Sequence, residues 1–181
     1  SDNAALTKPR DPRGLVMLHV MDDLDKAVER LDEKHNVARI NKWTALALKS
    51  RAALWEGTWR VYHADDVFAP KNDPTEFDGK PVELSAEYFL NIAADAAGQV
   101  IDNSGYSLYN GSGKDMNYRM LFATEDARED EVMLAILYNY STLKFGHAFQ
   151  SKYYEQSIGF TRRFVNHYLM ADGTRFTDRP D

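Results

Sequence analysis

Five carboxylates near residue 130 form the densest group of residues that could do chemistry. They are Glu125, Asp126, Glu129, Asp130 and Glu131. Calcium ions bind several carboxylate oxygens, and glycosidases use two carboxylates as acid and as base or nucleophile. The run lacks the alternating spacing and the glycine of an EF-hand loop. Because sequence does not place two carboxyl groups across a cleft, we interpret the run as solvated charge at the boundary of an element.

The histidines and glycines do not follow a catalytic spacing. The histidines, at positions 19, 35, 63, 147 and 167, show no HExxH or other close metal-binding pattern. His19 lies beside the apolar stripe of a predicted helix, so we interpret it as a packed or hydrogen-bonded core histidine. The segment YNGSGKD fails the phosphate-loop pattern, because its glycines are too close and no Ser or Thr follows its lysine. We therefore expect no cofactor.

The composition excludes several classes of protein. The chain has 181 residues, which suits one domain, and its 22 Lys and Arg against 28 Asp and Glu give a formal net charge of −6. This charge, without any basic run, disfavours nucleic acid and anionic lipid as partners. The chain has no Cys, which excludes disulfides and thiolate metal sites. No segment is apolar enough for a membrane span or a signal peptide, so we expect membrane association only through an upstream lipid anchor.

The first long helix is predicted near the start of the chain. In the segment 11–35, apolar residues recur every three or four positions and predict an amphipathic helix: Leu15, Leu18, Met21, Leu24, Val28 and Leu31. Asp11 is the predicted N-cap and Pro12 falls in the first turn. The opposite face, which carries Asp22 and Lys26 four residues apart, is predicted to be solvated.

A second helix is predicted over 41–63, and it is apolar on two faces. One stripe runs from Trp43 to Val61, and the other contains Leu48, Ala52, Trp55, Trp59 and Tyr62. A helix with two apolar faces is usually packed between neighbours, and alanines allow those neighbours to approach closely. We therefore interpret Trp55 and Trp59 as packing residues rather than a ligand platform. Their replacement by Ala is then expected to cost about 3–5 kcal/mol.

A third helix is predicted to begin at Ser85 and to end before Gly105, after a loop over 63–82 that is too rich in Pro and Asp to be regular. A short extended piece is predicted for 105–109. The apolar run 132–138 fits either a strand or a buried helix turn. A short helix in RRFVNHYLM should precede a turn at Asp172 and Gly173.

These elements predict a mainly α fold, a tetratricopeptide-like helical-repeat scaffold with long irregular loops. We expect a single domain over 1–181, with helical repeats in 12–110 and a loop-rich region with short elements in 111–181.

Five segments carry a resemblance to a known family. In order, they are MDDLDKAVERL, INKWTALALKSRAALWEGTW, YFLNIAADAAGQVIDNSGYSLY, EDEVMLAILYN and RRFVNHYLMADGTRF. Their serial order resembles the SusD/RagB glycan-binding lipoproteins of Bacteroidetes outer membranes. Members of that family are longer, so the chain would correspond to a middle portion of one SusD-like domain.

The resemblance implies a protein that is not an enzyme. It would capture oligosaccharides at the cell surface and pass them to a SusC-like TonB-dependent transporter, held at the outer membrane by a lipid anchor. The resemblance transfers no catalytic residue and no ligand contact. Two alternatives stay open: a tetratricopeptide-like adaptor that binds a protein partner in a groove on its helices, and a helical glycosidase.

Physical reasoning selects one stretch as the predicted glycan-binding site. A sugar ring presents an apolar C–H face and a rim of hydroxyls, so its site needs exposed aromatic rings beside amide, carboxylate or guanidinium groups. Between 139 and 154, aromatic and polar residues alternate without regular periodicity, as is typical of a binding loop. The predicted ligand-binding residues are Tyr140, Phe145, His147, Phe149, Tyr153 and Tyr154. The alternative for this stretch is aromatic cover for a downstream part of the fold.

A second predicted binding segment is the loop 63–82, with Phe68, Phe77 and several exposed carboxylates.

Overall fold

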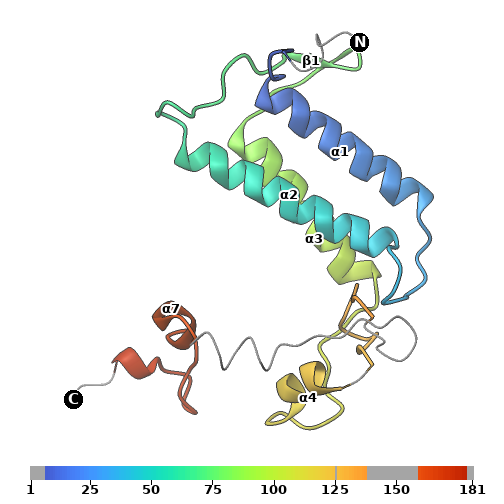
Figure 1. The fold of residues 1–181 in the computed structure, drawn as a ribbon, viewed down its shortest axis with the longest axis vertical. Helices are drawn as coiled ribbons and strands as arrows, with labels where there is room; N and C mark the ends of the chain where they lie inside the picture. The colour runs from blue at the N-terminus through green and yellow to red at the C-terminus, as the bar shows by residue number, and fades with distance from the viewer. Residues whose placement is uncertain (1–6, 125, 138–158, 179–181) are drawn as a thin grey trace. The chain divides into compact units, whose positions relative to one another are not determined.

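A computed structural model describes residues 7–124, 126–137 and 159–178, and in these residues the fold is mainly helical, as predicted (Figure 1). The elements in chain order are α1 (Arg13–Arg30), α2 (Lys42–Tyr62), β1 (Glu76–Phe77), β2 (Lys80–Pro81), α3 (Ala86–Asn103), α4 (Asn117–Ala123), α7 (Arg162–Val165) and the 3₁₀ turn η2 (Phe176–Asp178). The chain divides into two units, Ser1–Ile136 and Leu137–Asp181, each described by itself. None of the described helices combines the length and hydropathy that crossing a bilayer requires.

Helix α1 buries the predicted apolar stripe but begins one residue later than predicted. Leu18 and Met21 are buried, and the other stripe residues are partly buried. Pro12, with extended backbone angles, occupies the N-cap position, so the predicted N-cap Asp11 lies outside the helix. Its carboxylate instead pairs with Lys8 at 3.4 Å. The solvated face is confirmed, with an ion pair between Lys26 and Asp22.

A buried asparagine fixes the start of α2. The Asn41 side chain accepts a hydrogen bond from Thr44 N at 2.9 Å, and Asn41 N donates to Thr44 Oγ1 at 3.4 Å, which forms a capping box. The same side chain donates to Lys34 O at 3.1 Å and so holds the connection from α1. As a result α2 runs back antiparallel to α1 (Figure 1).

Helix α3 packs antiparallel against α2 through small residues (Figure 1). A Cβ added at Gly57 would lie 2.8 Å from the Leu90 side chain, so glycine is needed for this close approach. Ser50 Oγ also donates to Ala93 O at 2.8 Å across the interface. One core cluster contains Met21, Ala53, Phe89 and Ala93, and the second contains Trp43, Leu46, Ala96 and Val100.

Both predicted ends of α3 are confirmed. Ser85 Oγ accepts a hydrogen bond from Tyr88 N at 3.0 Å, which is an N-cap interaction. The helix ends at Asn103, and Gly105 follows with a positive φ of 76°. A positive φ just beyond a helix favours glycine, which has no Cβ to clash.

The prediction that the loop 63–82 is irregular throughout is wrong. Strands β1 and β2 form an antiparallel hairpin in which Phe77 pairs with Lys80. The two residues between the strands, Asp78 and Gly79, have φ angles of 49° and 75°. Two positive φ angles define the hairpin turn that Asp-Gly sequences favour.

The segment that follows α3 is largely irregular. The run 132–138 was predicted as a strand or a buried helix turn, but residues 132–137 form neither. Leu134 and Ile136 are exposed. Ala135 N donates to Val37 O at 2.7 Å, which ties this segment to the connection between α1 and α2. Helix α4, which lies before this run, has no buried residue.

The C-terminal unit contains the predicted turn and a helix, α7, that begins where predicted but ends at Val165, before the end of the predicted segment 162–170. Thr161 Oγ1 accepts from Phe164 N at 3.2 Å and caps α7. Met170 N then donates to Thr174 O at 2.7 Å, and Gly173 between them has a φ of 83°. This turn pairs Leu169 with Arg175 in an isolated bridge.

Candidate functional site

The predicted glycan-binding residues all fall outside the described part of the chain. They are Tyr140, Phe145, His147, Phe149, Tyr153 and Tyr154, within the stretch 138–158. Their arrangement therefore stays a prediction, and the described residues offer two other surfaces for ligands.

The interpretation of Trp55 as a packing residue is wrong. Its side chain is 67% exposed, and Leu48 and Tyr62 of the same stripe are also exposed. Helix α2 does lie between α1 and α3 (Figure 1), but it contacts them through other residues, including Ala53 and Gly57. An apolar stripe shows which face favours burial, but the stripe does not show that a neighbour covers it.

Trp59 is packed only in part, and its partner is a charged side chain. The Arg13 guanidinium carbon lies 3.8 Å from the centroid of the indole ring, and the ring is half-buried. This distance is typical of a cation–π contact. Arg13 therefore covers one face of the ring that was expected to pack between helices.

The exposed stripe of α2 forms one wall of an apolar groove against α1. The groove has a volume of about 570 Å³ and is lined by Met17, Val20, Leu48, Arg51, Ala52, Leu54, Trp55 and Thr58. Only Arg51 and Thr58 contribute polar side chains, and the Thr58 hydroxyl already lies 2.8 Å from Leu54 O, to which it donates. We call this the α1/α2 groove. Its chemistry suits apolar side chains better than the hydroxyl-rich rim of a sugar.

A buried cluster of charges joins α1, α2 and the loop before α3. Glu56 is fully buried, and its carboxylate accepts from Arg13 Nη2 at 2.7 Å and from Arg60 Nε at 2.8 Å. Arg60 is 5% exposed and also pairs with Asp73 at 2.6 Å. Asp73 Oδ1 in turn accepts from Gly14 N at 3.1 Å. Both carboxylates are neutralised by guanidinium groups, so the cluster fixes the fold and cannot do the work of a glycosidase pair.

In the described part of the acidic run near residue 130, Asp126, Glu129 and Asp130 are exposed, as the solvated interpretation predicted, whereas the Glu131 carboxylate is bonded to the protein. Glu131 Oε2 accepts from Tyr109 N at 2.6 Å, and Asp130 O accepts from Ser107 N at 2.8 Å. Arg128 lies over the Tyr109 ring, with its guanidinium carbon 4.7 Å from the centroid. In the described residues, no group of three or more candidate ligands is placed to hold a metal ion.

The histidines of the first unit have structural contacts. His19 is exposed and meets Phe77 edge-on at 5.1 Å, so its interpretation as a core histidine is wrong. His35 Nε2 lies 2.7 Å from Ser104 O, and the imidazole stacks on Tyr106 with ring centroids 4.0 Å apart. The stack joins the connection between α1 and α2 to the end of α3.

The loop 63–82 does not gather its aromatic and acidic groups into one site. Phe68 is exposed and meets the His63 ring edge-on at 5.6 Å, whereas Phe77 is partly buried in the hairpin. Asp66 is hydrogen-bonded to His63 at 2.6 Å, and this bond lowers the pKa of the Asp66 carboxyl. Asp73 belongs to the buried charge cluster.

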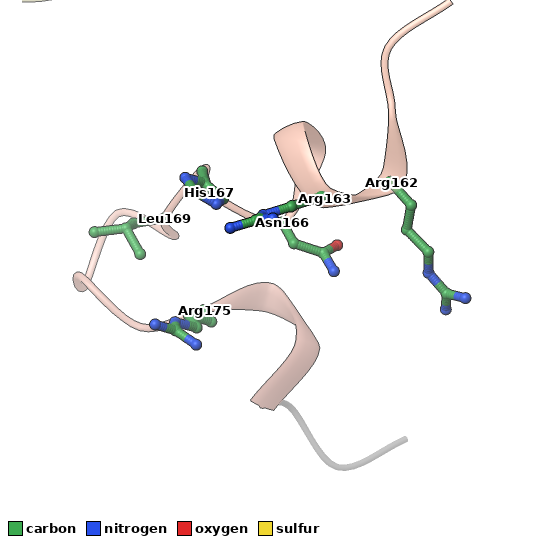
Figure 2. A pocket seen from close by; sticks show the side chains of 6 residues that line it. All are labelled: Arg162, Arg163, Asn166, His167, Leu169 and Arg175. Atoms are coloured by element: carbon green, nitrogen blue, oxygen red, sulfur yellow. The ribbon is translucent and has the colours of Figure 1, made fainter. Parts of the chain in front are cut away.

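The C-terminal unit contains a pocket whose lining includes three arginines and an amide. The pocket has a volume of about 500 Å³, and its lining residues are Arg162, Arg163, Asn166, His167, Leu169 and Arg175. Figure 2 shows Arg163, His167 and Arg175 around one opening, whereas Arg162 extends away from them. We call this the arginine pocket. The bridge between Leu169 and Arg175 brings Arg175 back to the segment that follows α7, the helix that carries Arg163.

Three exposed aromatic rings lie along the same short segment. Phe160 and Phe164 stack with centroids 5.0 Å apart, and Phe164 meets Tyr168 edge-on at 5.5 Å. Phe160 is 71% exposed, and Tyr168 is also exposed. These rings are four residues apart in the sequence, and this spacing is the signal that could have identified them. Aromatic, guanidinium and amide groups therefore occur together in residues 160–175.

Comparison of the chain with protein-family models, with curated proteins and with solved structures finds no match in any of the three.

Proposed function

We propose that this chain belongs to a non-catalytic protein that captures oligosaccharides for a SusC-like TonB-dependent transporter at the outer membrane. The observation that carries the proposal is that one short segment, 160–175, contains both the arginine pocket and the exposed rings of Phe160, Phe164 and Tyr168. These are the groups that a sugar needs, since aromatic rings cover its C–H face and guanidinium and amide groups bond its hydroxyls.

Two further features support the proposal. The serial order of the five family-like segments resembles the SusD/RagB glycan-capture lipoproteins. The antiparallel pairs α1–α2 and α2–α3 are the kind of unit from which a tetratricopeptide-like scaffold is built. In this proposal the helices form a rigid frame, loops hold the glycan, and a lipid anchor outside this sequence holds the protein at the cell surface.

The arginine pocket is exposed to solvent, which suits a protein that binds a ligand and then releases it. Its arginines are exposed, so a bound sugar stays in contact with water and displaces little of it. Such contacts give modest affinity, because the gain must first offset the lost freedom of the ligand. A protein that hands its ligand to a transporter needs fast dissociation, and weak binding provides it.

Affinity electrophoresis across a panel of neutral and acidic polysaccharides tests the proposal. We expect retardation by at least one glycan, which falls on Tyr168→Ala and not on Tyr118→Ala, an exposed aromatic of α4 that serves as the matched control. The triple substitution of Tyr140, Phe149 and Tyr153 by Ala tests the predicted loop in the same gel. Retardation by no glycan would reject the capture function, and release of reducing ends would instead support a glycosidase.

A protein-binding adaptor is the second candidate, and the α1/α2 groove favours it. The groove is apolar and exposed, and Trp55 forms part of its wall. An apolar helix face of a partner protein would fill such a groove. The two candidates separate in one comparison, because Trp55→Ala should leave glycan retardation unchanged if the chain captures sugars through its C-terminal unit. A glycan affinity that depends on Trp55 and not on Tyr168 contradicts this division.

A further inference from the structure

The arginine pocket concentrates positive charge in a chain that is negative overall. Three arginines, one histidine and one asparagine line it together with Leu169, and no carboxylate is among the described lining residues. The whole chain has a formal net charge of −6. The local charge of the pocket therefore opposes the average charge of the protein, and an anion near the pocket meets an attractive surface.

The carboxylates nearest in sequence are engaged elsewhere. Asp172 Oδ1 accepts from Thr174 N at 3.0 Å and from Thr174 Oγ1 at 2.6 Å, and these bonds lower the pKa of its carboxyl. Asp178 accepts from Thr177 Oγ1 at 3.3 Å.

Arg163 and Arg175 differ in their pairing from Arg13 and Arg60, the two arginines of the buried charge cluster. In the described part of the C-terminal unit, no ion pair involves Arg162, Arg163 or Arg175. By contrast, Arg13 and Arg60 are both paired with Glu56. The pocket guanidinium groups thus keep their paired N–H donors for a ligand.

We propose that the arginine pocket selects anionic glycans, those with carboxylate or sulfate groups, over neutral ones. The proposal rests on the capture function and names its class of ligand. A guanidinium group binds a carboxylate or a sulfate through two parallel hydrogen bonds, which a single hydroxyl does not offer. Arg163 and Arg175 lie on different sides of the opening in Figure 2 and can bind two anionic groups or both sides of one. The exposed rings of Phe164 and Tyr168 lie in the same short segment of the chain but are not among the residues that line the pocket.

The expected selectivity is modest and sensitive to salt. The arginines are exposed, and one exposed ion pair changes an affinity by a few-fold at most, so two pairs give about tenfold. Screening lengths fall from about 8 Å at physiological salt to about 3 Å at 1 M, so most of this preference should disappear at high salt.

Two matched pairs of polymers test the proposal on the full chain by affinity electrophoresis. Polygalacturonate and its methyl ester differ in the carboxylate charge, and dextran sulfate and dextran differ in sulfate. We expect tighter binding of the charged member in at least one pair, by about tenfold. The pair that shows the preference identifies carboxylate or sulfate as the recognised group.

The double variant Arg163→Gln with Arg175→Gln should lose this preference and keep the weaker binding of the neutral polymer. The control, Arg39→Gln with Arg119→Gln, removes the same two charges from exposed positions in the other unit and should retain the preference. Because all four arginines are exposed, we expect all variants to fold, and circular dichroism checks this.

Four outcomes overturn the proposal. Equal affinity for charged and neutral polymers, or an equal loss in the control variant, rejects the selection of anions and leaves the capture function standing. Binding of single-stranded DNA as tightly as of the acidic glycan marks a general polyanion surface and also rejects it. Binding of no polymer at all, neutral or charged, rejects the capture function together with the inference.

Discussion

Replacement of Glu56 by Ala should destabilise the helical unit more than any single surface change. The Glu56 carboxylate is fully buried and accepts hydrogen bonds from Arg13 and Arg60. Its removal leaves the Arg60 guanidinium buried with Asp73 as its remaining carboxylate, and Arg60 Nη2 already has no hydrogen-bond partner. Breaking a buried ion pair from one side costs about 3–5 kcal/mol. Arg13 is 37% exposed at its side chain and can turn to water, so we expect about 3 kcal/mol, at the lower end of that range.

Urea unfolding followed by far-ultraviolet circular dichroism measures this loss, because the helices lie mainly in the first unit. Asp22→Ala serves as the control, since it removes an exposed ion pair with Lys26 and should change stability by less than about 1 kcal/mol. The double variant Glu56→Ala with Arg60→Met should recover part of the loss, because it removes the stranded charge as well. A Glu56→Ala protein as stable as the Asp22→Ala protein would refute the reasoning.

Three other changes test separate parts of the structure. Gly57→Ala should cost about 1–3 kcal/mol in urea unfolding, because its Cβ would lie 2.8 Å from Leu90, and an unchanged midpoint would contradict the close packing. Trp55→Ala should cost less than about 1 kcal/mol, because the ring is exposed, and a loss of about 3–5 kcal/mol would restore the packing interpretation. The pKa of Asp66 lies below its usual 3.8 because of the hydrogen bond from His63, so its stabilising contribution is complete above about pH 4 and is lost as the pH falls through the lowered pKa. His63→Ala should raise this pKa in an NMR titration, and an unchanged value would show that His63 is not the cause.

The local parts of the fold were predictable from the sequence. The apolar spacing located all three long helices, and Ser85 and Gly105 gave both ends of α3, because a cap and a helix stop depend on neighbouring residues alone. The Asp78-Gly79 turn was equally local, and its signal was present although it was not used. These features need no knowledge of distant contacts.

The tertiary environment of α2 was not predictable in the same way. Glu56 and Arg60 are four residues apart, a spacing typical of an exposed helix pair, yet both are buried. Their burial depends on Arg13 and Asp73, which come from other elements. Trp55 illustrates the converse, since its apolar character predicted burial but no neighbour among the described residues covers it. Burial is decided by which elements meet, and periodicity within one helix does not determine that.

The candidate site was predictable only in its chemistry. A glycan site needs aromatic rings beside guanidinium or amide groups, and the sequence predicts them in 139–154, which lies outside the described residues. The arginine pocket supplies the guanidinium and amide groups a few residues later along the chain. Its assembly depends on the turn at Gly173, which pairs Arg175 with Leu169, four residues after the end of α7. The turn was predicted from the sequence, but the position of Arg175 in the pocket follows from its backbone pairing with Leu169, which the sequence does not show.

The two exposed surfaces favour ligands of different chemistry, and the difference can be measured. The α1/α2 groove is apolar and lies in the first unit, whereas the arginine pocket is cationic and lies in the second. A ligand held by apolar contact should bind with little dependence on salt, whereas one held by exposed guanidinium groups should weaken steeply as salt rises. The salt dependence of binding therefore distinguishes an apolar ligand from an anionic one before a variant is made. An anionic glycan that binds independently of salt would contradict the role given to Arg163 and Arg175.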